Sequence, residues 1–146
     1  MTTAQPNSID VMASWLEQSL SFFRQAQNVV HDPEASDAFR TAADLRALLL
    51  NDLRASAAVG NSTPQSAGLP ESLSYAVLQQ RFDPHRPERS ALDLLQRETA
   101  MLALIERVFR ESTNFRVRRL MQNCVQLFQR DARIWSRLAR RLTRAA

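Results

Sequence analysis

The sequence predicts an all-α protein, an antiparallel four-helix bundle made of two helical hairpins. Helix-favouring residues dominate, whereas the 146 residues include only two glycines and few β-branched side chains. Both glycines, Gly60 and Gly68, fall in one polar stretch. Four long segments repeat apolar residues at the three- and four-residue spacing of amphipathic helices. A chain of this length can bury one core without cross-links, so we expect residues 1–146 to form a single domain.

The first hairpin is expected over residues 8–58. Ser8 is a suitable N-cap for a helix that ends near Val30. Its apolar residues repeat every seven positions: Ile9, Leu16, Phe23 and Val30. Asp32 and Pro33 favour the start of a second helix, which ends near Ala58. Its core-facing residues are predicted to be Ala35, Phe39, Ala42, Leu45, Leu49 and Leu53. So short a turn makes the two helices antiparallel.

The second hairpin, residues 88–144, follows a linker that spans residues 59–87. The linker begins with a polar Gly/Pro/Ser stretch, and a short helix is expected over 71–81 before two prolines. A third long helix is expected over 88–112, with core-facing residues Leu92, Leu95, Thr99, Leu102, Ile105 and Phe109. A fourth is expected from Phe115 to about Thr143, with Asn114 as its cap. Its expected core-facing residues are Val117, Leu120, Cys124, Leu127, Phe128, Ile134, Trp135, Leu138 and Leu142.

Two stretches carry a resemblance to a known family. They are FFRQAQNVVHDPEASDAFRTAADLRALLLNDL, residues 22–53, and ALDLLQRETAMLALIERVF, residues 91–109. From about residue 12 onward the layout resembles the ferritin-like superfamily, and most closely its small bacterial two-hairpin bundles of unknown function. The resemblance consists of apolar positions and loop placement. It therefore implies a fold and leaves the activity open.

Ligands for a ferritin-type metal centre are missing from the sequence. Such centres take glutamates from two helices and a Glu-x-x-His motif from each of the other two. The only histidines, His31 and His85, fall in predicted turns. Asp44 and Asp131 lie on suitable helices, but an apolar residue stands three positions after each of them. We therefore expect no metal and no other cofactor.

Two acidic residues fall at or beside core-facing positions of the second hairpin, Glu98 and Asp131. One interpretation is an altered metal site that also uses Asp44. The other, which we favour, is a salt bridge or hydrogen bond to a nearby arginine or glutamine, because a buried charge needs a partner. The nearest such residues in sequence are Arg97, Gln129 and Arg130.

Other catalytic arrangements are also missing. The sequence has no glycine-rich phosphate loop, no Cys-x-x-Cys pair and no nucleophile elbow. Its single cysteine, Cys124, falls on an apolar face and is interpreted as a small core residue. A lone cysteine, no apolar run long enough to cross a bilayer and no leader-like N-terminus lead us to expect a cytoplasmic protein.

Positive charge is concentrated in the second half of the chain. All 19 basic residues are arginines. Residues 1–73 hold four arginines and eight acids, whereas residues 74–146 hold fifteen arginines and seven acids. The last predicted helix carries a run of arginines, most of them on one helical face: Arg130, Arg133, Arg137, Arg140, Arg141 and Arg144.

Several roles are open for these six arginines. They can be solvated, or they can pair with acids of the first hairpin such as Asp37, Asp44 and Asp52. They can also bind an acidic protein or another copy of the chain; a nucleic acid or an anionic membrane surface is a further choice that the pattern favours less. We expect a non-enzymatic, metal-free protein with an interaction or stress-associated role. The alternative is a metal-binding oxidase or storage protein with an atypical carboxylate site.

Overall fold

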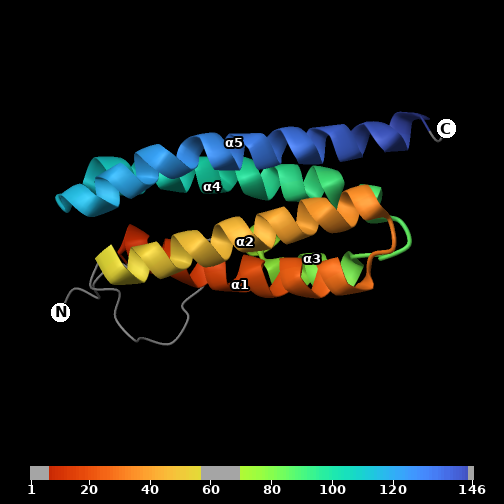
Figure 1. Cartoon of the computed structure of the whole chain (residues 1–146), viewed down its shortest axis with the longest axis horizontal. Coiled ribbons are helices and arrows are strands. Elements are labelled where there is room, and N and C mark those ends of the chain that lie inside the picture. The colour runs from red at the N-terminus through yellow and green to blue at the C-terminus, as the bar shows by residue number, and fades with distance from the viewer. Residues whose placement is uncertain (1–6, 57–69, 145–146) are drawn as a thin grey trace.

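The computed structural model describes residues 7–56 and 70–144, and it confirms the predicted all-helical class (Figure 1). Four long helices lie along the longest axis: α1 (Ser8–Val29), α2 (Pro33–Ser56), α4 (Ala91–Glu111) and α5 (Phe115–Arg144). Three shorter elements connect α2 to α4: the 3₁₀ turn η1 (Glu71–Leu73), helix α3 (Tyr75–Arg81) and the 3₁₀ turn η2 (Pro87–Ser90). In the described ranges, no helix combines the length and hydropathy that crossing a bilayer requires. The polar stretch predicted within 59–69 lies outside the described residues.

The long helices pack in sequential pairs, and the pairs pack on each other. α1 contacts α2, and α4 contacts α5; between the pairs, α2 contacts α5 and α1 contacts α4. In Figure 1, α1 and α5 run in one direction along the molecule, whereas α2 and α4 run in the other. Helix α3 lies beside α1 and returns the chain to the end of the molecule where α4 begins.

Side-chain caps define the helix starts, with one difference from the prediction. The cap of α1 is Asn7, whose side chain accepts a hydrogen bond from the Ile9 amide at 3.1 Å, so the assignment to Ser8 is wrong by one residue. Asp32 caps α2 as predicted, accepting from the Ala35 amide at 2.8 Å. Asn114 also caps α5 as predicted, because its Oδ1 accepts from the first-turn amides at 2.9 and 3.3 Å. These caps satisfy amides that have no partner within the helix.

The expected helix over 71–81 is divided at Ser74. Ser74 caps α3 by accepting from the Ala76 amide at 3.2 Å. From α4, the Arg97 guanidinium donates to the carbonyls of Ser72 and Ser74, at 3.0 and 2.8 Å. The same side chain therefore holds both short elements against α4.

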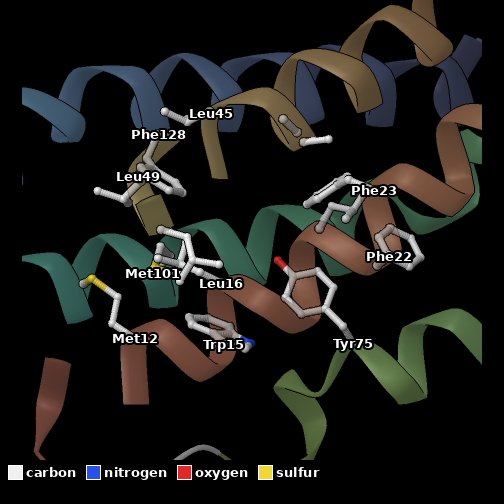
Figure 2. Packing of buried hydrophobic residues seen from close by; sticks show 14 of the residues in the cluster. Met12, Trp15, Leu16, Phe22, Phe23, Leu45, Leu49, Tyr75, Met101 and Phe128 are labelled. Atoms are coloured by element: carbon white, nitrogen blue, oxygen red, sulfur yellow. The ribbon is translucent and has the colours of Figure 1, made fainter. Parts of the chain in front are cut away.

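Aromatic rings fill the centre of the molecule (Figure 2). Phe23 stacks on Trp135 with a centroid distance of 5.6 Å and an interplanar angle of 7°. Tyr75, from the short helix α3, packs its ring 5.7 Å from Phe22 and 5.9 Å from Phe23. Figure 2 shows its hydroxyl directed into the space between the long helices. Phe39 of α2 also lies 5.6 Å from Trp135, so these rings join α1, α2 and α5 to α3.

The core-facing side of α4 differs from the prediction. Leu92 is 61% exposed, Thr99 is exposed, and Leu95, Leu102 and Phe109 are only half-buried. The buried side chains of α4 are Ala91, Leu94, Arg97, Glu98, Met101, Leu104, Ile105 and Val108. Ile105 is buried as predicted, and Leu95, Leu102 and Phe109 pack against the edge of the core, so the prediction was wrong for Leu92 and Thr99 and placed the centre of the buried face to one side. The reason is that α4 carries apolar residues on two adjacent faces, and the amphipathic pattern alone does not say which face meets the core.

Candidate functional site: a buried charge cluster and an arginine face

Three charged side chains meet in the core, one from each of three helices. Arg46 of α2 bonds with Nη1 to Asp131 Oδ2 of α5 at 3.1 Å, and with Nη2 to Glu98 Oε1 of α4. All three side chains are buried, with exposed fractions of 0 to 1%. We call these three residues the buried charge cluster. It is the point where α2, α4 and α5 are joined by ion pairs.

The guanidinium of Arg46 lies between two aromatic rings. Its Cζ is 4.5 Å from the centroid of Phe23 and 5.0 Å from that of Phe128. Nη1 also donates to the Ala42 carbonyl one turn earlier, at 3.1 Å. Cation–π contact and charge-assisted hydrogen bonds together offset part of the cost of removing the guanidinium from water.

Burial and pairing act in opposite directions on the pKa values of the cluster. Burial alone would lower the pKa of Arg46, but Glu98 and Asp131 hold it above its usual value, so the guanidinium stays charged. Burial raises the pKa of Glu98 to about 7, although Arg46 opposes the shift. Burial likewise raises the pKa of Asp131. Burial therefore favours the protonated form of both carboxyls, whereas the Arg46 guanidinium favours their ionised form.

The cluster is incompletely satisfied. Arg46 Nε, Glu98 Oε2 and Asp131 Oδ1 are buried without a hydrogen-bond partner among the described residues. The Trp135 indole is near enough to lower the pKa of Glu98, but its Nε1 is outside hydrogen-bond geometry with any described atom. A buried polar atom without a partner costs about 1–3 kcal/mol. The ion pairs nevertheless tie α2, α4 and α5 together in one arrangement, because separating any partner would leave a buried charge uncompensated.

These residues do not fit a ferritin-type metal centre. Asp44, the third member of the alternative carboxylate set, is exposed on α2. The guanidinium of Arg46 bonds to both Glu98 and Asp131, so a cation already lies where a metal would bind them. Across residues 7–56 and 70–144, no group of three or more His, Cys, Asp or Glu residues could hold a metal ion.

The pairing of Glu98 and Asp131 with an arginine matches the favoured interpretation, but the arginine is one that the sequence analysis did not name. Arg97 turns instead towards η1 and α3. Arg130 lies at 3.9 Å from Asp131 and remains largely exposed. The sequence did contain a signal for the burial of Arg46. This residue lies four positions after Ala42 and three before Leu49, both of which are predicted to face the core.

The outer side of α5 is basic. Four of the predicted arginines, Arg130, Arg133, Arg137 and Arg140, are exposed, and we call these the arginine face. The backbone of Arg144 lies in α5, but its side chain is outside the described residues. The only acid on α5 is Asp131, which is buried in the charge cluster. Apart from the 3.9 Å contact of Arg130 with the buried Asp131, no acidic side chain of α5 offsets the exposed arginines.

Arg141 differs from the arginine face, because it pairs with the first hairpin. Its Nη1 is 3.1 Å from Asp32 Oδ2, and its Nη2 is 2.5 Å from Glu34 Oε2. Of the suggested acid partners, Asp37 pairs with Arg40 of its own helix. Among the described residues, Asp44 and Asp52 form no ion pair with α5, so the contact uses other acids than those suggested.

Cys124 lies on the buried side of α5. Its thiol donates to the Met121 carbonyl at 3.3 Å, and burial raises its pKa to about 12. A thiol with so high a pKa is not a nucleophile at neutral pH. This environment agrees with the interpretation of Cys124 as a core residue.

Comparison with known proteins adds no assignment. No family model, no curated protein and no solved structure matches the chain.

Proposed function

We propose that this chain is a non-catalytic, metal-free interaction protein that binds an acidic partner protein through the arginine face. In this proposal its fold is a ferritin-like four-helix bundle. The observation that carries the binding role is the set of exposed arginines on α5, without an acid on the same exposed surface of the helix. An anionic partner would relieve their mutual repulsion.

The order and direction of the long helices support the bundle assignment. Helices α2 and α4 run in the same direction (Figure 1). The chain therefore returns from the end of α2 to the start of α4 along the length of the molecule, through a segment that contains α3. Ferritin-like bundles use one such long crossover between two hairpins. The same layout was expected from the resemblance of residues 22–53 and 91–109.

The charge cluster supports the absence of a metal. In ferritin-like metalloproteins, inward carboxylates need a metal to offset their charge. Here Arg46 supplies the positive charge to Glu98 and Asp131. The alternative role as an oxidase or storage protein has no comparable support, because Asp44 is turned to solvent.

An acidic protein fits the arginine face better than a single-stranded nucleic acid. Proteins that bind single strands combine basic residues with aromatic rings on which bases stack. Both tryptophans, Trp15 and Trp135, are fully buried and cannot serve in this way. The exposed aromatic ring of α5, Phe115, lies about 22 Å along the helix from Arg130, the nearest residue of the arginine face. The arginine face itself presents guanidinium groups alone, which suits carboxylates as bidentate partners.

Charge reversal tests the proposal. Arg133→Glu combined with Arg137→Glu should weaken binding to poly-glutamate at least tenfold, and binding by the unchanged protein should fall steeply with added salt. The matched control is Arg24→Glu with Arg81→Glu, which makes the same charge change at exposed positions on α1 and α3. Equal loss in both variants would show that only net charge matters and would overturn the proposal.

A further inference from the structure

An apolar groove lies along the junction of α4 and α5, next to the arginine face. One hollow of about 410 Å³ is lined by apolar side chains of both helices and by three polar ones at its edge: Leu102, Ile105, Glu106, Phe109, Met121, Gln122, Val125 and Gln129. A second hollow of about 310 Å³ shares Phe109 and Gln122 with it, and adds Phe115, Arg118 and Arg119. Because the two hollows share lining residues, we treat them as one, the α4/α5 groove.

The apolar lining of the groove belongs partly to the core, because Ile105 and Met121 are buried, but the core does not cover its outer side chains. Leu102, Phe109 and Val125 are half-buried and pack at the edge of the core cluster. Phe115, at the start of α5, is 73% exposed. The C-terminal half of the α4 stripe that the sequence predicted as core-facing, from Leu102 to Phe109, thus borders this groove. Exposed apolar side chains that gather beside charged ones are typical of interaction sites.

The basic end of the groove contains a contact between an arginine and an aromatic ring. Arg118 Cζ lies 4.5 Å from the centroid of the Phe109 ring, so a cation–π contact holds this guanidinium over the groove. Arg119 lines the same hollow. This contact favours conformations in which the guanidinium faces the groove, which lowers the entropy cost of binding a carboxylate there.

We propose that the α4/α5 groove seats an amphipathic helix of an acidic partner protein, with its apolar residues in the groove and its acidic residues against α5. This inference rests on the proposed function and adds the apolar half of the recognition. Helices that bind in grooves place apolar anchors at one-turn spacing. The lining residues Leu102 and Phe109 are seven positions apart on α4, which spans about 10 Å, or two turns.

Charge selects this occupant over a second copy of the chain. A symmetric pair of grooves would bring α5 of one copy towards α5 of the other. Each copy would bring one lining acid, Glu106, against the exposed Arg118, Arg119 and arginine face, so positive charge would remain in excess at the contact. Like charges at an interface are unfavourable unless acids intervene. An acidic partner removes this repulsion.

The test uses a helical peptide of leucine and glutamate with leucines along one side, and poly-glutamate as a probe without apolar anchors. Leu102→Gln with Phe115→Ala should weaken peptide binding about tenfold and leave poly-glutamate binding unchanged. The control Leu48→Gln alters a 59% exposed leucine on α2 and should change neither. Thermal unfolding of each variant verifies that the fold is retained, and Phe115→Ala alone serves if the double variant unfolds.

The outcomes separate this inference from the proposed function. Loss of peptide binding in Arg133→Glu/Arg137→Glu but not in the groove variant would overturn the groove and leave the arginine face standing. Loss in the groove variant alone would support the groove and count against the arginine face. If the unchanged protein is a dimer and the groove variant is a monomer, the occupant is a second copy of the chain and the inference is wrong. The inference is also wrong if the groove variant loses binding to a single-stranded oligonucleotide but not to the peptide, because the occupant is then a nucleic acid.

Discussion

Arginine has opposite roles in two regions of this protein. In the core, Arg46 is fully buried between two aromatic rings and bonds to two carboxylates. On the outer side of α5, Arg133 and Arg137 are exposed and form no ion pair with any described residue. The two regions differ in their access to water. The buried guanidinium keeps its charge only because carboxylates pair with it, whereas the exposed guanidinium groups are hydrated and remain available to another molecule. Substitutions should therefore change stability in the first region and binding in the second.

Removing the buried cation should have the largest effect. Arg46→Met leaves Glu98 and Asp131 buried without their partner, so we expect a loss of about 3–5 kcal/mol in the free energy of unfolding. Urea denaturation followed by circular dichroism measures it.

A triple variant separates two quantities: the penalty of leaving buried carboxylates unpaired, and the net contribution of the buried charge cluster to the free energy of unfolding. Arg46→Met with Glu98→Leu and Asp131→Leu should recover most of the lost stability, because apolar replacements leave no unpaired charge. Failure to recover would mean that the cluster stabilises the fold beyond charge compensation. A single variant as stable as the unchanged protein would contradict the burial of the pair.

Stability should also depend on pH through Glu98. The folded protein holds this proton more tightly than the unfolded chain, since burial raises the pKa from 4.5 to about 7. Protonation of Glu98 therefore adds to the free energy of unfolding below about pH 4.5. This added stability, on the order of 3 kcal/mol, is lost as the pH rises to about 7. The raised pKa of Asp131 acts in the same direction.

Glu98→Gln is the matched control, because it keeps the shape and removes the titration. The variant should lose much of the decline between pH 4.5 and 7 that the unchanged protein shows in denaturant titrations. Equal slopes for the two proteins would place the pH dependence elsewhere and would mean that Glu98 stays ionised in the fold.

Arg141 is intermediate in burial between Arg46 and the exposed arginines of α5, so its substitution should change stability less than that of Arg46. It is partly exposed and pairs with Asp32 and Glu34 across the two hairpins. Arg141→Gln should lower the free energy of unfolding by about 0.5–1 kcal/mol, and less in high salt, because exposed pairs are weak and screened. A loss several times larger would show that this contact holds the hairpins together. Arg140→Gln, at a neighbouring exposed position, is the control.

Much of the fold could be predicted from the sequence, because the signals are local. Asp32 and Asn114 cap their helices as expected, and the turns fall where polar and proline residues interrupt the apolar pattern. The core-facing side of α4 could not be predicted in the same way. Leu92 and Leu102 fit an amphipathic pattern as well as Leu94 and Met101 do, and only the positions of α1 and α5 decide between them.

The candidate site was predicted only in part, because its partners are distant in sequence. Glu98 and Asp131 stood out as acids at core positions, but Arg46 lies 52 and 85 residues away from them. An arginine is ordinarily assigned to the surface, and its burial depends on acids that only the tertiary fold brings near. The arginine face was easier to predict, since helical spacing alone determines which residues share a side.

The smallest effect on stability is expected for the arginine face itself. Arg133→Glu with Arg137→Glu should change the free energy of unfolding by less than about 1 kcal/mol, because neither side chain pairs with a described residue and exposed charges interact weakly. Relief of repulsion within α5 favours the variant slightly, and both positions lie about two turns or more before the end of the helix, so the helix dipole contributes little. Thermal and urea unfolding beside Arg24→Glu/Arg81→Glu measure the difference. A large fall in melting temperature in the α5 variant alone would show that these arginines, like Arg46, have acidic partners within the chain, and the contrast between the two regions would fail.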